Sequence, residues 1–306
     1  MRGPVELPPA RTFGPLVRLA LDEDIGPGDA TTRLVVPEDR LGVGLVEARE
    51  RLVVCGLPIA RHVLEEVDSA LEVEILASEG AMAEPGEPLV RVRGALHGIL
   101  AGERTALNFL MRMCGVASTT RRFVAAVEGT GASIVDTRKT LPGWRALDKY
   151  ATAVGGARNH RVGLFDGILL KDNHVAAAGG VSLAVKTACA AAPANLRVQV
   201  EVESEPQALE AVSAGADFLL LDNCTPEQVR GIAARLRGRA LLEVSGGVTL
   251  KNVRDYAEAG VQRISIGALT HSAPAADVAL ELDGAKPPEP RGGAEPGATA
   301  PGGAGA

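Results

Sequence analysis

The chain has 306 residues, of which 46% are apolar and 23% charged, and its formal net charge at pH 7 is -6. This length and composition indicate a globular protein with enough core for one large domain or two ordinary ones. The acidic balance argues against a protein that binds nucleic acid through a basic face. No apolar run is long enough to span a membrane, and no signal-peptide pattern begins the chain, so no membrane partner is expected. The four cysteines are scattered without metal or disulfide spacing, and we expect a cytoplasmic protein in a reducing compartment.

The first part of the chain mixes helix and strand patterns, which predicts a compact α/β domain over residues 14–129 after an N-terminal arm at 1–13. Residues 58–67 are typical of a short helix because their apolar residues are spaced for one face. We expect helices at residues 14–24, 58–67 and 99–127, the last interrupted near Gly115, and strands at residues 42–54, 71–78 and 88–94.

After residue 130 short apolar strands alternate with helices, which implies parallel strands joined by right-handed crossovers. This pattern predicts an incomplete (β/α) barrel over residues 130–283, and the lack of a G-x-G-x-x-G after its first strand weakens the alternative, an open Rossmann-like sheet. The Pro/Gly/Ala-rich tail at 284–306 is expected to be disordered. Strands are expected at 132–136, 167–171, 197–203, 217–222, 240–244 and 263–267, and helices at 144–154, 183–192, 206–214, 226–236, 250–259 and 274–282.

The end of each predicted barrel strand carries charged, polar or glycine residues, whereas the strand bodies are apolar. In a barrel these ends converge on one face, where active sites lie. The last two ends are rich in glycine and precede helices, so their amides can bind a phosphate closely. The residues at these ends are Arg138, Lys139, Lys171, Glu201, Glu203, Asp222, Ser245, Gly246, Gly247 and Gly267.

A group of cations on the long helix and the first two loops suits a substrate with more than one carboxylate, because guanidinium groups bind carboxylates through paired hydrogen bonds. Lys171 stands out because it ends an apolar strand, and burying an unpaired lysine is costly. The group comprises Arg104, Arg138, Lys139, Arg158, His160, Arg161 and Lys171.

Glu201 and Asp222 form an acidic pair on neighbouring strand ends. They could hold Mg²⁺, stabilise a developing cation on a sugar, or form ion pairs with Lys171. Glu203 and Glu243 share strand faces with site residues, so either could also point inward.

At these residues the sequence resembles the quinolinate phosphoribosyltransferases, also called nicotinate-nucleotide pyrophosphorylases (carboxylating). The D-T-R-K-T-x-P-G and R-N-H-R strings are together highly specific, and the resemblance covers residues 14–283. The Pro/Gly tail and Val244, where Ala is common, are the departures. The matching stretches are residues 103–108, 136–145, 155–161, 170–174, 221–223 and 243–247.

The resemblance implies an N-terminal α/β sandwich domain, an incomplete barrel, and a homodimer or larger assembly in which Arg104 comes from the neighbouring subunit. It implies transfer of a phosphoribosyl group from phosphoribosyl pyrophosphate to quinolinate with decarboxylation, giving nicotinate mononucleotide for de novo NAD biosynthesis. Quinolinate would be bound by Arg104, Arg138, His160, Arg161 and Lys171. Phosphoribosyl pyrophosphate would be bound by Lys139, Ser245, Gly246, Gly247, Gly267 and His271. Mg²⁺ would be held by Glu201 and Asp222, which with Lys139 and Lys171 would be catalytic.

Three alternatives remain at this point. A Schiff-base aldolase would use Lys171 as its nucleophile. A relative of the family could act on another base, although the arginine-rich loop favours a diacid. A non-enzymatic scaffold would keep the fold without turnover.

Overall fold

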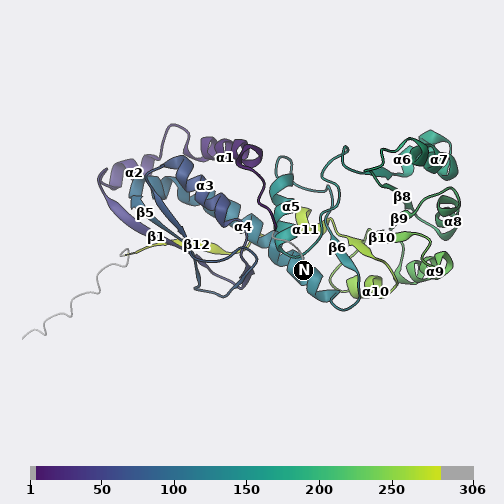
Figure 1. Cartoon of the computed structure of the whole chain (residues 1–306). Helices are drawn as coiled ribbons and strands as arrows, with labels where there is room; N and C mark the ends of the chain where they lie inside the picture. Colours follow the sequence, from purple (N-terminus) through teal and green to yellow (C-terminus); the bar gives the residue numbers. More distant parts are fainter. Residues whose placement is uncertain (1–4, 284–306) are drawn as a thin grey trace, which may run out of the picture.

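The structure of the chain, a computed structural model, describes residues 5–283. The predicted tail at 284–306 and the first residues of the predicted arm lie outside the described residues. Two lobes lie at either side of one long helix, α4 (Leu96–Ala126) (Figure 1). Each lobe has its own cluster of buried apolar side chains. No single helix of the described residues passes a length-and-hydropathy test for crossing a membrane, although α6 (Asp172–Ala178) and α7 (Val181–Ala191) pass it together as a bent pair.

The N-terminal lobe is built on an antiparallel sheet with the strand order β12-β1-β5-β3. Alternate residues of β1 are buried, as expected of a sheet that packs one face on helices. The predicted strand at 42–54 is two strands, because the charged run Arg49–Arg51 leaves the sheet and a short pair, β2 with β4, follows. The bounds are β1 (Leu41–Ala48), β2 (Leu52–Val53), β3 (Glu72–Ile75), β4 (Met82–Ala83), β5 (Pro88–Ala95), α1 (Ala10–Ile25), α2 (Ala30–Val35) and α3 (Leu57–Val67).

Helix α1 begins four residues before its predicted start, so residues 10–13 belong to it and not to an arm. Phe13 and Val17 are buried on one face of α1, and their burial extends the helix N-terminally past Pro15. Packing of this face outweighs the preference of proline for a helix start.

The last element of the described chain is a strand, β12 (Val278–Leu282), and the predicted helix at 274–282 is wrong. β12 pairs antiparallel with β1 of the N-terminal sheet, with Leu280 opposite Val46. Its apolar residues alternate in steps of two, which suits an edge strand of a half-buried sheet. The range 130–283 predicted for the barrel therefore includes a strand of the other lobe.

The long helix α4 has 31 residues and is not interrupted at Gly115, which corrects the prediction. A Cβ on Gly115 would lie 2.0 Å from the carbonyl oxygen of Pro274. The glycine thus permits close approach of the segment that leads to β12, and it does not break the helix.

The C-terminal lobe holds six parallel strands in the order β6-β11-β10-β9-β8-β7. The first strand lies beside the last, as in a barrel, and a single parallel bridge joins Val135 of β6 to Arg158. Within the described residues β7 pairs only with β8, so the barrel is incomplete. The predicted fold class is confirmed. The strands are β6 (Ser133–Val135), β7 (Ile168–Leu170), β8 (Val198–Val202), β9 (Phe218–Asp222), β10 (Leu241–Ser245) and β11 (Arg263–Ser265).

Helices follow the barrel strands and cover their outer side (Figure 1). The start of the helix after β9 was correctly predicted, because Thr225 forms a reciprocal capping box with Gln228. The helix α6 directly after Lys171 was not predicted. The remaining helices are α5 (Arg145–Val154), α8 (Glu205–Ser213), α9 (Pro226–Leu236), α10 (Val253–Ala257) and α11 (Ala268–His271).

Candidate active site

A cavity of about 350 Å³ lies at the carboxyl ends of the barrel strands. Its lining comes from the ends of all six strands and from the segment that follows the bridge at Arg158. The barrel therefore brings most of the predicted site residues together, as the strand-end argument required. Those that line the cavity are Arg138, Lys139, His160, Arg161, Lys171, Glu201, Asp222 and Ser245.

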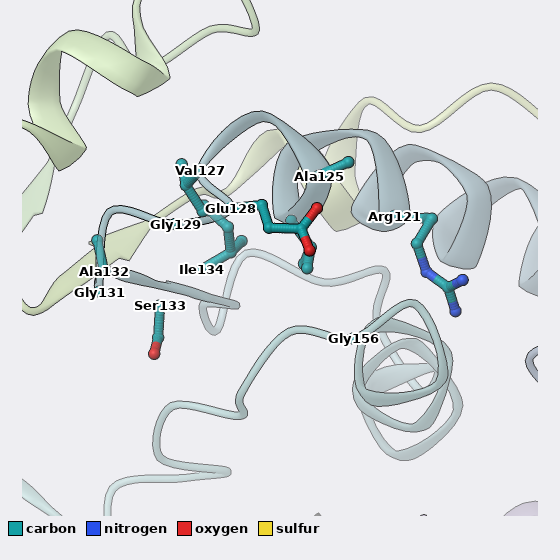
Figure 2. Close-up of a pocket in the computed structure, with 11 residues that line it drawn as sticks. Arg121, Ala125, Val127, Glu128, Gly129, Gly131, Ala132, Ser133, Ile134 and Gly156 are labelled. Carbon is teal, nitrogen blue, oxygen red and sulfur yellow. The ribbon is translucent and has the colours of Figure 1, made fainter.

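A second cavity, of about 450 Å³, lies at the opposite, amino-terminal end of β6. Figure 2 shows Arg121 of α4 and Glu128, in the turn that follows α4, beside this cavity. The guanidinium of Arg121 donates to the carbonyl oxygens of Gly155 (3.0 Å) and Val154 (3.3 Å), so it caps the end of α5. No predicted site residue lines this cavity, and it is not the candidate site.

Arg138 and Arg161 give the barrel-mouth cavity its positive character. Burial lowers the pKa of the Arg161 guanidinium, and the charge of nearby Arg138 lowers it further. Nε of Arg138 is buried and has no hydrogen-bond partner among the described residues. Two partly desolvated guanidinium groups in one pocket favour an anion between them, and a dicarboxylate satisfies this requirement.

Lys171 is half exposed, which corrects the expectation that it is buried. Its Nζ lies 3.1 Å from Oε2 of Glu201, so the ion pair that the sequence left open as an alternative is formed. The Glu201 side chain is only 12% exposed, and the ammonium group therefore balances a largely desolvated carboxylate.

Asp222 ends β9 beside Ser245 of β10, its register partner. Burial raises the pKa of its carboxyl, and the positive charges of Lys171 and Lys139 partly oppose that rise. Nδ2 of Asn223 donates to Oδ2 of Asp222 at 2.8 Å. The carboxyl is therefore held at the cavity edge among cations, with no salt bridge of its own among the described residues.

The glycine loop after β10 turns sharply, with φ values of 90° at Gly246 and 64° at Gly247. A Cβ on Gly246 would lie 2.1 Å from Oδ1 of Asn223. The next helix, α10, begins at Val253 and not at Leu250 as predicted, because residues 250–252 form a turn. Phosphate binding here would rest on the loop amides and not on a helix directly after the glycines.

Gly267, at the end of β11, lies against the side chains of Lys139 and His271. A Cβ at this position would come within 2.9 Å of the Lys139 side chain and 3.1 Å of the His271 ring. Gly246, Gly247, Gly267 and His271 border the cavity without lining it.

Arg104 and Arg158 do not reach the cavity within the chain. Arg104 lies exposed on α4, and Arg158 lies exposed at the bridge to β6. Glu203 is exposed outside the cavity, whereas Glu243 points into the barrel and is fully buried.

A buried ion pair at the wall of the cavity was missed by sequence reasoning; one member, Asp136, is among the residues that line the cavity. Oδ1 of Asp136 accepts from Nζ of Lys149 at 2.6 Å and from the His160 amide at 2.7 Å. Burial raises the pKa of Asp136, and the pairing with Lys149 and the hydrogen bond from His160 oppose the rise. Lys149 lies among the buried residues of α5, between Leu147 and Ala151, and a lysine in this stretch was the signal that could have revealed the pair.

A barrel whose strand ends set arginine and lysine beside two carboxylates defines an enzyme that acts on anionic small molecules. The family model of the quinolinate phosphoribosyl transferase N-terminal domain matches residues 29–114, and that of the C-terminal domain matches residues 116–281. The chain belongs to this family.

Relatives and solved structures agree with this assignment. The chain is 44% identical to the nicotinate-nucleotide pyrophosphorylase (carboxylating) of Mycobacterium leprae, covering 87% of this chain and 95% of that protein. It is 38% identical to a probable nicotinate-nucleotide pyrophosphorylase (carboxylating) of Bacillus subtilis, covering 85% and 90%. The solved nicotinate-nucleotide pyrophosphorylase of Francisella tularensis superposes with a TM-score of 0.85 at 33% identity, covering 92% of this chain and 100% of that chain.

Proposed function

We propose that this chain transfers the phosphoribosyl group of phosphoribosyl pyrophosphate to quinolinate and releases CO₂ and pyrophosphate, giving nicotinate mononucleotide for de novo NAD synthesis. The observation that carries the proposal is the convergence of Arg138, Arg161 and Lys171 on one cavity that also contains Glu201 and Asp222. The names of the relatives, which refer to quinolinate and nicotinate nucleotides, support it.

In this proposal the two carboxylates of quinolinate bind to the guanidinium groups of Arg138 and Arg161 and to Lys171. The buried, unpartnered Nε of Arg138 supports this role, because an anion would satisfy it. Arg104 contributes from a neighbouring subunit, since within one chain it lies away from the cavity.

The 5-phosphate of the second substrate binds at the amides and side chains around the last two strand ends. Gly246 and Gly247 adopt left-handed backbone conformations and carry no side chain, so the backbone can approach a phosphate closely. The residues proposed for this subsite are Ser245, Gly246, Gly247, Gly267 and His271, with Lys139 at the pyrophosphate.

The chemistry then follows from charge. The ring nitrogen of quinolinate forms a bond to the anomeric carbon as the bond to the pyrophosphate oxygen breaks, and positive charge develops on the ribose. Glu201 and Asp222 stabilise that charge, while Lys139 neutralises the departing pyrophosphate. The quaternary ring nitrogen withdraws electrons, so the adjacent carbon–carboxylate bond can break, leaving its electron pair on the ring carbon to be protonated.

The residues present fit Mg²⁺ bound together with substrate. The described residues contain no group of three or more His, Cys, Asp or Glu that could hold a metal by themselves, whereas Glu201 and Asp222 offer two carboxylates at neighbouring strand ends. Mg²⁺ commonly uses one or two carboxylates and completes its shell with water and phosphate oxygens. When bound, it would neutralise charge on the pyrophosphate group.

A direct test of the pocket is Lys171→Met, which keeps the length of the side chain and removes its charge. We expect kcat/KM for quinolinate to fall by about 10²- to 10³-fold, as when one stabilising donor is removed from an active site. The protein should still fold, with a free energy of unfolding lower by about 1–3 kcal/mol, because the change leaves the largely desolvated Glu201 carboxylate without its partner. Lys186→Met, at an exposed position of α7, is the matched control, and unchanged turnover in Lys171→Met would remove Lys171 from the site.

We also propose that the chain is a homodimer or larger assembly with shared sites, in a reducing, cytoplasmic compartment. All four cysteines are free, which supports the proposal of a reducing compartment.

Mixing inactive Arg104→Ala and Lys171→Ala chains should restore about a quarter of the wild-type activity, because half of the dimers are mixed and one of their two sites is intact. A mixture of Lys171→Ala with Asp222→Asn is the control and should stay inactive, since both changes affect the same half-site. No recovery in the first mixture despite verified subunit exchange would contradict a shared site.

A further inference from the structure

The backbone of His160 is held on both sides by the buried ion pair. Its amide donates to Oδ1 of Asp136 at 2.7 Å, and its carbonyl oxygen accepts from Nζ of Lys149 at 3.0 Å. Asp136 is fully buried and Lys149 is 3% exposed. The ion pair of Asp136 and Lys149 therefore fixes the backbone of His160.

Both ring nitrogens of His160 also lie within hydrogen-bonding distance of a neighbouring group. Nδ1 lies 2.8 Å from the Arg161 amide, which can only donate, so Nδ1 accepts and carries no proton. The neutral ring therefore bears its proton on Nε2. This nitrogen lies 3.1 Å from Oε1 of Gln199 and 3.4 Å from Oε1 of Glu243.

Glu243 lies on β10 inside the barrel and is fully buried. Ser265 of β11 donates its hydroxyl to the same Oε1. Nε2 of His160 and the Ser265 hydroxyl thus both meet Oε1 of Glu243, whereas Oε2 of Glu243 and Nε2 of Gln199 are buried without a hydrogen-bond partner among the described residues. The Glu243 carboxyl group therefore has no contact with solvent, and its Oε1 faces the His160 ring.

We propose that Glu243 is a positioning residue that fixes the Nε2–H tautomer and the plane of the His160 ring, and that this ring in turn fixes the backbone from which the Arg161 guanidinium enters the cavity. His160 then acts through Arg161 and does not bind the diacid through its own ring. This inference rests on the proposed function only for the identity of the diacid.

This arrangement explains how the Arg161 side chain is held toward the cavity although the barrel is incomplete next to it. Arg161 lies in the segment between β6 and β7, where the barrel is incomplete. Among residues 5–283, its guanidinium makes one hydrogen bond, from Nη1 to the carbonyl oxygen of Gly167 at 3.2 Å. Holding its backbone through the preceding ring supplies the rigidity that precise binding requires.

The spectroscopic test uses ¹⁵N-labelled histidine in the intact protein, with the His160 signal assigned from its loss in His160→Gln. The ring should show a protonated Nε2 and an unprotonated Nδ1, and saturation with quinolinate should leave both unchanged. A ring protonated on Nδ1, or one that becomes doubly protonated when the diacid binds, would overturn the proposal. This measurement needs no turnover, and quinolinate binding is followed separately by calorimetry.

The kinetic test compares Glu243→Leu with Glu243→Gln. Leucine removes the acceptor, so KM for quinolinate should rise by about tenfold while KM for phosphoribosyl pyrophosphate changes by less than about twofold. Glutamine keeps an acceptor oxygen and should restore KM to within about twofold of wild type. Adding His160→Ala to Glu243→Leu should cause little further loss, because both act through one path.

The matched control is Val244→Ala, the next residue on β10, which is fully buried in the outer core of the barrel. It should lower stability and leave both KM values unchanged. An unaltered KM for quinolinate in folded Glu243→Leu, or equal changes in both KM values, would overturn the proposal. If Glu243→Leu does not fold, the ¹⁵N measurement of the His160 tautomer in the wild-type protein tests the proposal instead. A wild-type protein that neither binds nor consumes quinolinate would contradict the proposed function and leave the tautomer result valid.

Discussion

Asp222 combines a role in the proposed site with an unfavourable environment for its charge. Burial raises the pKa of its carboxyl above the ordinary value of about 3.9, although Lys171 and Lys139 lower it. In a ¹³C titration, the Asp222 signal should therefore titrate above that value, and Lys171→Met should move the titration higher still. Asp29, whose pKa is lowered by hydrogen bonds from Thr32, should titrate below the ordinary value in the same spectrum.

The same shift predicts a dependence of stability on pH. In the window between the ordinary value and the raised one, the folded protein binds more protons at Asp222 than the unfolded chain does, so this group lowers stability as pH rises. At neutral pH, Asp222→Asn should have a higher melting temperature than wild type. The difference should shrink as pH falls below about 3.9, where the wild-type carboxyl is also uncharged. A lower melting temperature for the variant at neutral pH would contradict this.

Much of the candidate site could be predicted at the scale of residues. Apolar runs mark where barrel strands end, so the sequence alone predicts that Lys171, Glu201 and Asp222 lie at one face, and all three line the cavity. The pairing of Asp136 with Lys149 could not be predicted, because an ion pair 13 residues apart depends on how α5 packs against β6. Whether Glu203 or Glu243 points inward was open for the same reason.

At the scale of elements, α4 packs closely against the segment before β12 because Gly115 has no side chain. Gly115→Ala places a methyl group against the Pro274 carbonyl, and we expect the free energy of unfolding to fall by about 1–3 kcal/mol, as in overpacked cores. Chemical denaturation followed by circular dichroism measures the change.

Gly231 provides the matched control for Gly115. It also lies inside a helix, α9, but a Cβ there would meet nothing within 4 Å. Gly231→Ala should therefore raise the free energy of unfolding by about 0.5–1 kcal/mol, since alanine has the higher helix propensity. Equal effects of the two substitutions would show that Gly115 serves helix propensity and not packing.

Elements with strong local patterns were predicted, and those decided by distant partners were not. The barrel strands followed from apolar runs, and the start of α9 followed from the small polar residue Thr225 before Pro226. The strand β12 was read as a helix because its Ala and Leu residues favour a helix locally, whereas the open edge of β1 makes it a strand. No local signal identifies that partner.

At the scale of the whole molecule, the chain returns to its first lobe after completing the barrel. β12 pairs with β1 and becomes the edge strand of the N-terminal sheet, and Val278 is buried in the core of that lobe. A chain ending at Asp277 should be less stable than a chain ending at Asp283 by at least about 1.5–3 kcal/mol, the burial of one such side chain. Equal melting temperatures of the two truncated chains would show that β12 adds nothing to the fold.

The connecting helix also ties the lobes to the site. Arg112 of α4 donates to Asp148 of α5 at 2.9 Å and to the carbonyl oxygen of Thr270. Thr270 in turn donates its hydroxyl to the carbonyl oxygen of Lys139 at 2.9 Å. The position of Lys139 at the cavity thus depends on contacts that start at the boundary between the two lobes.

The central claim is that one barrel mouth binds a pyridine diacid and a phosphoribosyl donor together. Its most direct test is the release of ¹⁴CO₂ from carboxyl-labelled quinolinate by the purified full-length chain. We predict release, with formation of nicotinate mononucleotide, only when phosphoribosyl pyrophosphate and Mg²⁺ are both present. No release under these conditions, or release without the phosphoribosyl donor, would contradict the account.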